Sequence, residues 1–261
     1  MIELGKTKRQ TIKPICQDSE EVLVQGAVEG KVGRVFVPQL EHSSYCLIHV
    51  GDFAYVLGLP PNGERALDLK SKIYADCGRA FLIPGDERWA AWLEEEFSGQ
   101  YRLVNRYALK KDEHHFDKAL LEEYKKDIPD GIRIRKIDER LYRMILKEEW
   151  CRDFCSNFDD EAHFMRDGLG FVAMKGREII AGCSAYGYSN GMMEIEVGTR
   201  KDYRRKGLAL ACSAAFLLEC MARGIYPNWD AANEQSVGLA EKLGYVLQKE
   251  YQVYQLADLE E

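Results

Sequence analysis

The second half of the chain shows a regular succession of apolar patterns that predicts alternating strands and helices. Strands are expected where apolar residues alternate with polar ones, and helices where apolar residues recur every three or four positions. The expected elements are strand 132–137, helices 139–155 and 160–166, strands 170–174, 178–188 and 193–199, helix 208–223, strand 226–230, helix 236–242 and β-like runs 245–249 and 251–255. This order predicts a mixed sheet flanked by helices, an α/β (α+β) fold.

The first half is less regular but also mixes both kinds of element. Its β-like runs are residues 22–24, 34–37, 45–50, 53–57, 79–84 and 101–109. Apolar residues at helical spacing predict a helix over 87–97. A Pro-Asp-Gly turn that ends at Gly131 interrupts the pattern between the halves. We therefore expect two domains, an N-terminal α/β domain over residues 1–125 and a C-terminal domain over residues 130–261.

Composition narrows the class of protein. The 261 residues are 46% hydrophobic and 30% charged, without a low-complexity run, which is typical of a globular chain of two ordinary domains. The net charge of −7 argues against nucleic-acid binding, which relies on basic side chains, and suits a cationic or amine substrate. We expect no membrane span and no export signal, and eight dilute cysteines that stay reduced in the cytoplasm.

The segment 203–209 predicts a phosphate-binding turn, because it joins an expected strand to an apolar helix. Backbone N–H groups at a helix N-terminus converge on an anion, and Gly207, which has no Cβ, lets a pyrophosphate approach the main chain. Basic residues before it add counter-charge, and a small residue after it keeps the first helical turn thin. The residues expected to act here are Arg204, Arg205, Lys206, Gly207, Leu208 and Ala209.

Two motifs carry a family resemblance. Arg204-x-x-Gly207-x-Ala209 resembles the Gln/Arg-x-x-Gly-x-Gly/Ala pyrophosphate signature of the GNAT (GCN5-related) N-acetyltransferase superfamily. Residues 229–245, with an Asn, a short helix and Leu-Gly-Tyr, are similar to that family's later segment. Both motifs in this order are more specific than either alone. The resemblance covers residues 130–256, and the chain looks most similar to the two-part bacterial branch that includes zwittermicin A resistance acetyltransferases.

The resemblance implies a GNAT fold in the second half, with acetyl-CoA as co-substrate and no metal. It further implies that the backbone of Val197, Gly198 and Thr199 pairs with the pantetheine arm and polarises the thioester oxygen. Asn233 and Ser236 are expected to contact coenzyme A, although both residues could equally cap the following helix. The first half contains no such signature. It is interpreted as an acceptor-specificity or structural domain, with a degenerate GNAT-like half as one alternative.

Two carboxylates are candidates for the base that deprotonates an incoming amine. Glu194 and Glu196 alternate along the expected strand 193–199, so both would project from one face of the sheet. The alternative is that they form the solvated face of that strand.

Ala240 departs from the family pattern, since many members carry a Tyr there that protonates the leaving thiolate. Tyr245, Tyr203 or water could take that role, or the thiolate could leave unassisted. The main hypothesis is transfer of acetyl to the primary amine of a small molecule, by direct attack in a ternary complex of a monomer or homodimer. The alternatives are a coenzyme A-binding sensor with little turnover and a protein or peptide N-acetyltransferase.

Two further pairs of residues are expected to serve packing. Cys151 and Cys155 lie one helical turn apart, but no Cys/His pair at zinc-site spacing accompanies them. Trp89 and Trp92 could form an aromatic wall for a substrate, although this spacing is more typical of a helix packed on a sheet.

Overall fold

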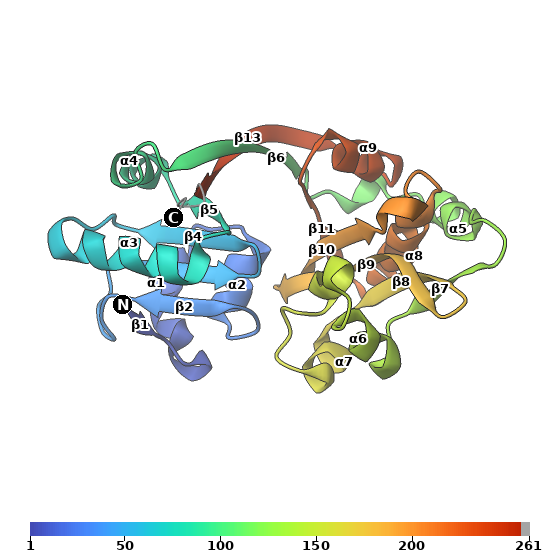
Figure 1. Ribbon diagram of the computed structural model, residues 1–261, viewed down its shortest axis with the longest axis horizontal. Helices are drawn as coiled ribbons and strands as arrows, with labels where there is room; N and C mark the ends of the chain where they lie inside the picture. Colours follow the sequence, from blue (N-terminus) through green and yellow to red (C-terminus); the bar gives the residue numbers. More distant parts are fainter. Residues whose placement is uncertain (257–261) are drawn as a thin grey trace. The chain divides into compact units, whose positions relative to one another are not determined.

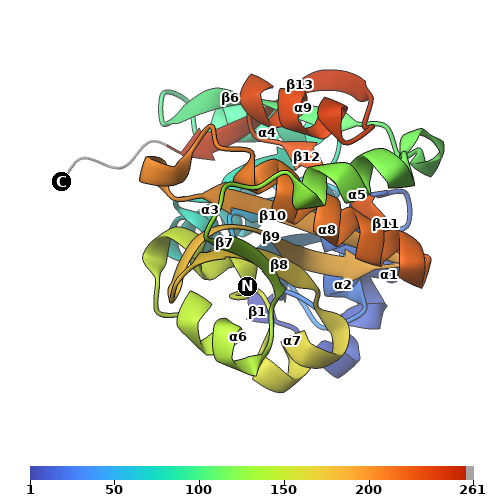
Figure 2. The same ribbon diagram turned by 90° about the vertical axis from the view of Figure 1, so that its right-hand side faces the viewer.

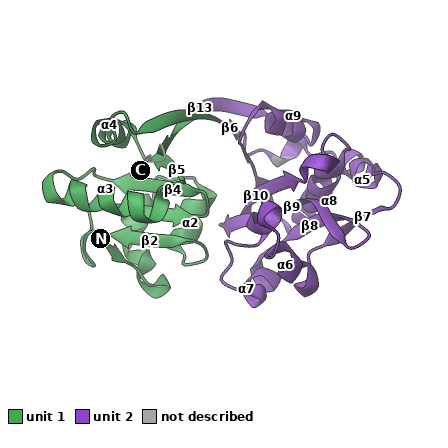
Figure 3. Ribbon diagram, in the orientation of Figure 1, with its two compact units in different colours: residues 1–105, 251–261 green, residues 106–250 purple. Residues whose placement is uncertain are grey.

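The computed structural model describes residues 1–256, which form two compact units (Figure 3). Unit 1 contains residues 1–105 and the C-terminal segment from Tyr251, and unit 2 contains residues 106–250. The division lies before the boundary expected near residue 130, because helix α5 (Lys118–Lys126) packs against helix α8 (Leu208–Arg223) and so belongs to unit 2. Within residues 1–256, every helix is too short or too polar to cross a bilayer.

Unit 2 is built on a five-stranded sheet with the order β11-β10-β9-β8-β7. The strands are β7 (Ile132–Lys136), β8 (Gly170–Lys175), β9 (Glu178–Ser189), β10 (Met192–Thr199) and β11 (Tyr226–Asn228). The first four are antiparallel neighbours, and β11 joins β10 in parallel after the crossover through α8. The mixed sheet flanked by helices is therefore confirmed.

Helices cover both faces of this sheet (Figures 1 and 2). On one face, Cys183 of β9 is buried in the core that α8 completes. On the other, the neighbouring Ser184 donates a hydrogen bond of 2.5 Å to the carbonyl of Phe154 in the 3₁₀ segment η3 (Glu149–Phe154). Consecutive strand residues point to opposite faces, so α8 and η3 lie on opposite sides of β9. The same side of the sheet as η3 carries α6 (Glu139–Ile145) and α7 (Glu161–Asp167) in Figure 2.

Most expected elements of the second half are present, with four differences. The single helix expected over 139–155 is divided into α6 and η3, because Glu148 between them is extended. The strand expected over 226–230 is divided into β11 and β12 (Asp230–Ala231). The two final β-like runs form one strand, β13 (Leu247–Leu256), and the short helix α9 (Glu234–Lys242) begins two residues earlier than predicted.

Unit 1 repeats the order of elements found in unit 2. Both units run from a strand through helical segments to three antiparallel strands, a helix, a parallel strand and a second helix. In unit 1 these are β1 (Ile2–Glu3), η1 (Lys6–Ile12), α1 (Lys13–Cys16), α2 (Val22–Val28), β2 (Arg34–Val37), β3 (Tyr45–Val50), β4 (Phe53–Gly58), α3 (Gly63–Cys77), β5 (Phe81–Pro84) and α4 (Glu87–Glu96). Strand β6 (Tyr101–Leu109) leads into unit 2, with the 3₁₀ turn η2 (Glu113–His115) before α5. The repeated order supports the interpretation of unit 1 as a degenerate copy.

One prediction for unit 1 is wrong. Residues 22–24 begin α2 instead of a strand, and all of its residues except Gln25 are buried. Because α2 is apolar on every side, its first three residues show no periodicity that would distinguish a helix from a buried strand.

Two tryptophans of α4 fill the space beside the connection from β4 to α3. Trp89 donates its indole N–H to the carbonyl of Gly58, and Trp92 donates to the carbonyl of Pro61, both at 2.9 Å. The side chains are 0% and 8% exposed, and their rings contact each other edge to face at 5.4 Å. These residues therefore serve packing, and the aromatic substrate wall is not formed.

All eight cysteines are free thiols and buried. Burial raises the pKa of Cys77, Cys151 and Cys220 to about 12. Because the thiolate is the reactive form, we expect no fast reaction of the native protein with Ellman's reagent at about pH 8, and eight reactive thiols after denaturation. Rapid labelling of even one thiol in the native protein would contradict the buried positions.

Candidate functional site

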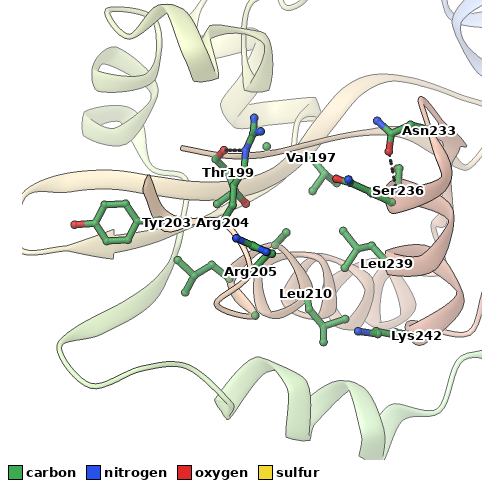
Figure 4. A pocket seen from close by; sticks show the side chains of 15 residues that line it. Val197, Thr199, Tyr203, Arg204, Arg205, Leu210, Asn233, Ser236, Leu239 and Lys242 are labelled. Atoms are coloured by element: carbon green, nitrogen blue, oxygen red, sulfur yellow. Dashed lines mark hydrogen bonds between the residues drawn. The ribbon is translucent and has the colours of Figure 1, made fainter. Parts of the chain in front are cut away.

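A cavity of about 630 Å³ opens in unit 2 between the end of β10, the start of α8 and the exposed side of α9 (Figure 4). Val197 and Thr199 lie on the β10 side, and Asn233, Ser236 and Leu239 lie on the α9 side. The lining residues are Val197, Gly198, Thr199, Tyr203, Arg204, Arg205, Gly207, Leu208, Ala209, Leu210, Asn233, Gln235, Ser236, Leu239 and Lys242.

The cavity exists because β10 and β11 separate. Their parallel pairing runs only from Met192 opposite Tyr226 to Glu194 opposite Asn228, whereas β10 stays paired with β9 as far as Thr199. After Asn228 the chain turns away, and Asp230 pairs with Ala108 of β6 instead. Val197, Gly198 and Thr199 thus have no strand partner on their β11 side within the described chain, so that edge of the backbone can pair with an extended ligand.

The first turn of α8 closes one end of the cavity and has the geometry of an anion site. Gly207 is the N-cap, with φ of +77°, and no side chain caps the helix. The first N–H groups of α8 therefore lack an intrahelical partner and point out of the helix N-terminus. Arg204 and Arg205 line the same end, and the Arg204 Nε group lies 3.4 Å from the Thr199 carbonyl oxygen. This end of the cavity is suited to a phosphate-bearing ligand.

Of the expected coenzyme A contacts, the structure brings together all except Lys206. Lys206 does not line the cavity, because its ammonium group donates to the carbonyl of Asp202 and lies over the Tyr203 ring at 4.7 Å. Tyr203, expected only as a candidate acid, also lines the cavity, and four lining residues were not predicted from the sequence: Leu210, Gln235, Leu239 and Lys242. The last three follow helical spacing along α9, so they could have been found by extending the face of Ser236.

Asn233 and Ser236 have capping roles as well as positions in the cavity wall. The Asn233 side chain accepts a hydrogen bond of 3.0 Å from the Ser236 N–H and so caps α9. The Ser236 hydroxyl accepts a bond of 3.1 Å from the indole N–H of Trp229, which is buried. These bonds hold the α9 side of the cavity in place.

Glu194 belongs to a buried polar cluster at the point where β10 and β11 separate. Its side chain is only 6% exposed, accepts a bond of 2.6 Å from the Asn228 amide, and lies 3.3 Å from the Asp230 N–H. Arg106, 5% exposed, donates to the Asp230 carboxylate at 2.5 Å. Glu194 is thus not part of a solvated face. Glu196 is half-buried, and neither carboxylate lines the cavity.

The candidate acids for the thiolate differ in position. Tyr245 is buried, donates its hydroxyl to the Pro227 carbonyl at 2.6 Å and does not line the cavity. Burial also raises the pKa of this phenol. Tyr203 does line the cavity, and the Arg200 guanidinium lies over its ring at 4.7 Å. Ala240 is fully buried in the core.

Comparison with known proteins decides the family. The family model of GNAT acetyltransferases matches residues 13–254. The chain belongs to this family. The GNAT chain is 25% identical over 180 residues to an uncharacterised N-acetyltransferase, YdfB, of Bacillus subtilis, which covers 67% of this chain and 66% of that relative. A GCN5-related N-acetyltransferase-like protein from Streptococcus suis is 34% identical, with a TM-score of 0.85 over 97% of this chain and 100% of the other.

A tandem GNAT protein from the clavulanic acid biosynthesis pathway is also similar to the GNAT chain in fold. Its TM-score is 0.59 at 13% identity, over 97% of this chain and 96% of that protein. The GNAT chain is therefore an N-acetyltransferase of a family that normally uses acetyl-CoA. Among residues 1–256, no three His, Cys, Asp or Glu side chains form a group that could hold a metal ion.

Proposed function

We propose that the protein transfers the acetyl group of acetyl-CoA to the primary amine of a small molecule, by direct attack in a ternary complex. The observation that carries this proposal is that one cavity contains both the N-terminus of α8, which no side chain caps, and the open edge of β10. An anion site and an unpaired strand edge match the two ends of one ligand, with phosphates at one end and an extended amide-bearing arm at the other.

The residues present fit acetyl-CoA. Gly207 leaves room for the pyrophosphate at the N-terminus of α8, and Arg204, Arg205 and Lys242 supply positive charge around it. The N–H and carbonyl groups of Val197 to Thr199 would bind the pantetheine arm along β10. A backbone N–H there would also stabilise the negative charge that develops on the thioester oxygen.

We assign the base to Glu194. A coenzyme that extends along β10 from the α8 end brings its thioester toward the place where β10 meets β11, and Glu194 is the last residue of β10 paired there. Its contacts with Asn228 and Asp230 hold the carboxylate at this point, from which it would accept a proton from the amine directly or through water. Tyr203 lines the cavity at its α8 end, where the phosphates would bind, so we propose that the thiolate leaves unassisted or takes a proton from water.

The acceptor is proposed to be a small amine. We also propose that the resemblance of the sequence motifs to zwittermicin A resistance acetyltransferases extends to the class of substrate, which makes amino-bearing antibiotics the first class to examine. Unit 1 is proposed to have a structural or specificity role, since indoles occupy the place beside its β4–α3 connection.

The test is thiol release from acetyl-CoA with a panel of polyamines, amino acids, aminoglycosides, other amino-bearing antibiotics and short peptides. We expect release with at least one small amine. Release only with peptides would favour a peptide N-acetyltransferase. Tight acetyl-CoA binding without any release would favour a sensor, an alternative supported by the buried Ala240 at the position of the usual acid.

A further inference from the structure

A second cavity in unit 2, of about 380 Å³, is lined by four arginines. Arg133 and Arg135 come from β7, Arg140 from the first turn of α6, and Arg177 from the turn between β8 and β9. No residue lines both this cavity and the one beside α8. Figure 2 shows β7, β8 and α6 side by side in this part of unit 2.

The positive charge around this cavity is scarcely neutralised by the protein. The one carboxylate in its lining is Asp138, which accepts the Leu141 N–H at 2.8 Å and lies 3.6 Å from Arg135. Within residues 1–256, Arg133, Arg140 and Arg177 have no carboxylate partner.

Acidic residues next to these arginines are paired elsewhere. Glu139, which precedes Arg140, forms an ion pair of 3.3 Å with Arg143. Glu178, which follows Arg177, forms one of 3.2 Å with Arg200. Four positive charges around one cavity repel one another. A chain with a net charge of −7 has enough carboxylates to pair with these arginines and so remove the repulsion.

The remaining lining gives the cavity an apolar side. Leu141, Met144 and Met174 lie among the arginines, and Gly131 and Gly176 keep two of the walls free of side chains. Guanidinium groups bind phosphate oxygens in pairs, and several of them on separate elements can hold several phosphates at once.

We propose that this arginine cavity is a binding site for a small organic molecule carrying two or more linked phosphates, with its organic part against the apolar side chains. The site is separate from the coenzyme cavity and independent of the proposed reaction. A single phosphate would engage too few of the arginines to bind well at physiological salt, whereas a polyphosphate spans guanidiniums of β7, α6 and the β8–β9 turn.

The test is titration calorimetry with inorganic tripolyphosphate and, for comparison, inorganic phosphate. We expect tripolyphosphate to bind at least about tenfold more tightly than phosphate. The double substitution Arg133→Gln/Arg177→Gln should weaken it about a hundredfold, because two charge-assisted contacts are lost. The matched control Lys147→Gln/Arg152→Gln removes the same charge from exposed positions outside the cavity and should change binding less than about threefold.

The same titration with the Gly207→Glu variant separates the two sites, because Gly207 lines the cavity beside α8 and not the arginine cavity. Unchanged tripolyphosphate binding in this variant supports the arginine cavity, whether or not acetyl transfer is ever observed. A loss of binding in this variant would place the anion at α8 and overturn the proposal, as would an equal loss of binding in the control variant or no binding to the unaltered protein.

Discussion

Gly207→Glu is expected to weaken acetyl-CoA binding at least about a hundredfold and so to abolish turnover. The substitution puts a Cβ on a residue with φ of +77°, where L-residues are strained, and a carboxylate at the N-terminus of α8. A negative charge there repels the pyrophosphate and competes for the same N–H groups. Losing two contacts to a charged ligand is worth about 3 kcal/mol or more, which corresponds to at least two decades in the dissociation constant. Calorimetry with acetyl-CoA measures it.

Gly224→Glu provides the matched control. Gly224 ends the same helix with φ of +65°, and an added Cβ there meets nothing within 4 Å. The control therefore carries the same charge and a similar backbone strain, and should bind acetyl-CoA as the unaltered protein does. If Gly207→Glu binds acetyl-CoA normally while folded, the phosphates are held elsewhere and the assignment of the cavity fails.

Glu194→Gln is expected to lower kcat by about 10²–10⁴, the usual contribution of a positioned general base. The KM for acetyl-CoA should change little, because Glu194 does not line the cavity. Glu196→Gln makes the same change two residues along β10 and should lower kcat less than about tenfold. The reverse ranking would assign the base to Glu196, and normal kcat in both variants would exclude a carboxylate base on this strand.

A structural effect of Glu194 can be separated from a catalytic one. Asn228→Ala removes the amide that donates to Glu194 but leaves the carboxylate. We expect it to lower the melting temperature at least as much as Glu194→Gln does, because a buried hydrogen bond is lost, while retaining much more of kcat. An equal loss of kcat in both variants would mean that the buried cluster as a whole, and not the carboxylate, supports turnover.

Those parts of the site that depend on local backbone geometry were predictable from the sequence. The left-handed N-cap requires a glycine at position 207, and binding of an anion requires positive charges beside it. Both features fall within the seven residues 203–209, so the sequence pattern shows them together. Arg106 was not predictable, since it contacts Asp230 across 124 positions of sequence and nothing in the spacing of either residue indicates the other. The end of β11 at Asn228 was also missed, because residues 226–230 have a continuous β pattern and the division arises from pairing with β6.

The fold of unit 1 illustrates the same limit. Strands β2 to β5 and the helix over 87–97 followed from periodicity. The contacts of Trp89 and Trp92 with the β4–α3 connection did not, because helical spacing shows which face is buried and not what it meets. Lys206 lies within the motif but does not take the predicted role. Its ammonium group donates to the Asp202 carbonyl, which only the folded turn brings close.

The indoles of Trp89 and Trp92 fill the space beside the β4–α3 connection of unit 1 with side chains of the protein itself. A space filled by covalently attached side chains cannot be emptied by dilution, so this part of unit 1 gains no stability from a ligand bound there. A unit that binds a diffusible coenzyme, as proposed for unit 2, gains stability in proportion to the logarithm of the coenzyme concentration. A fall in acetyl-CoA would then destabilise the region around the start of α8, whereas the β4–α3 connection of unit 1 would keep the contacts that the two indoles supply.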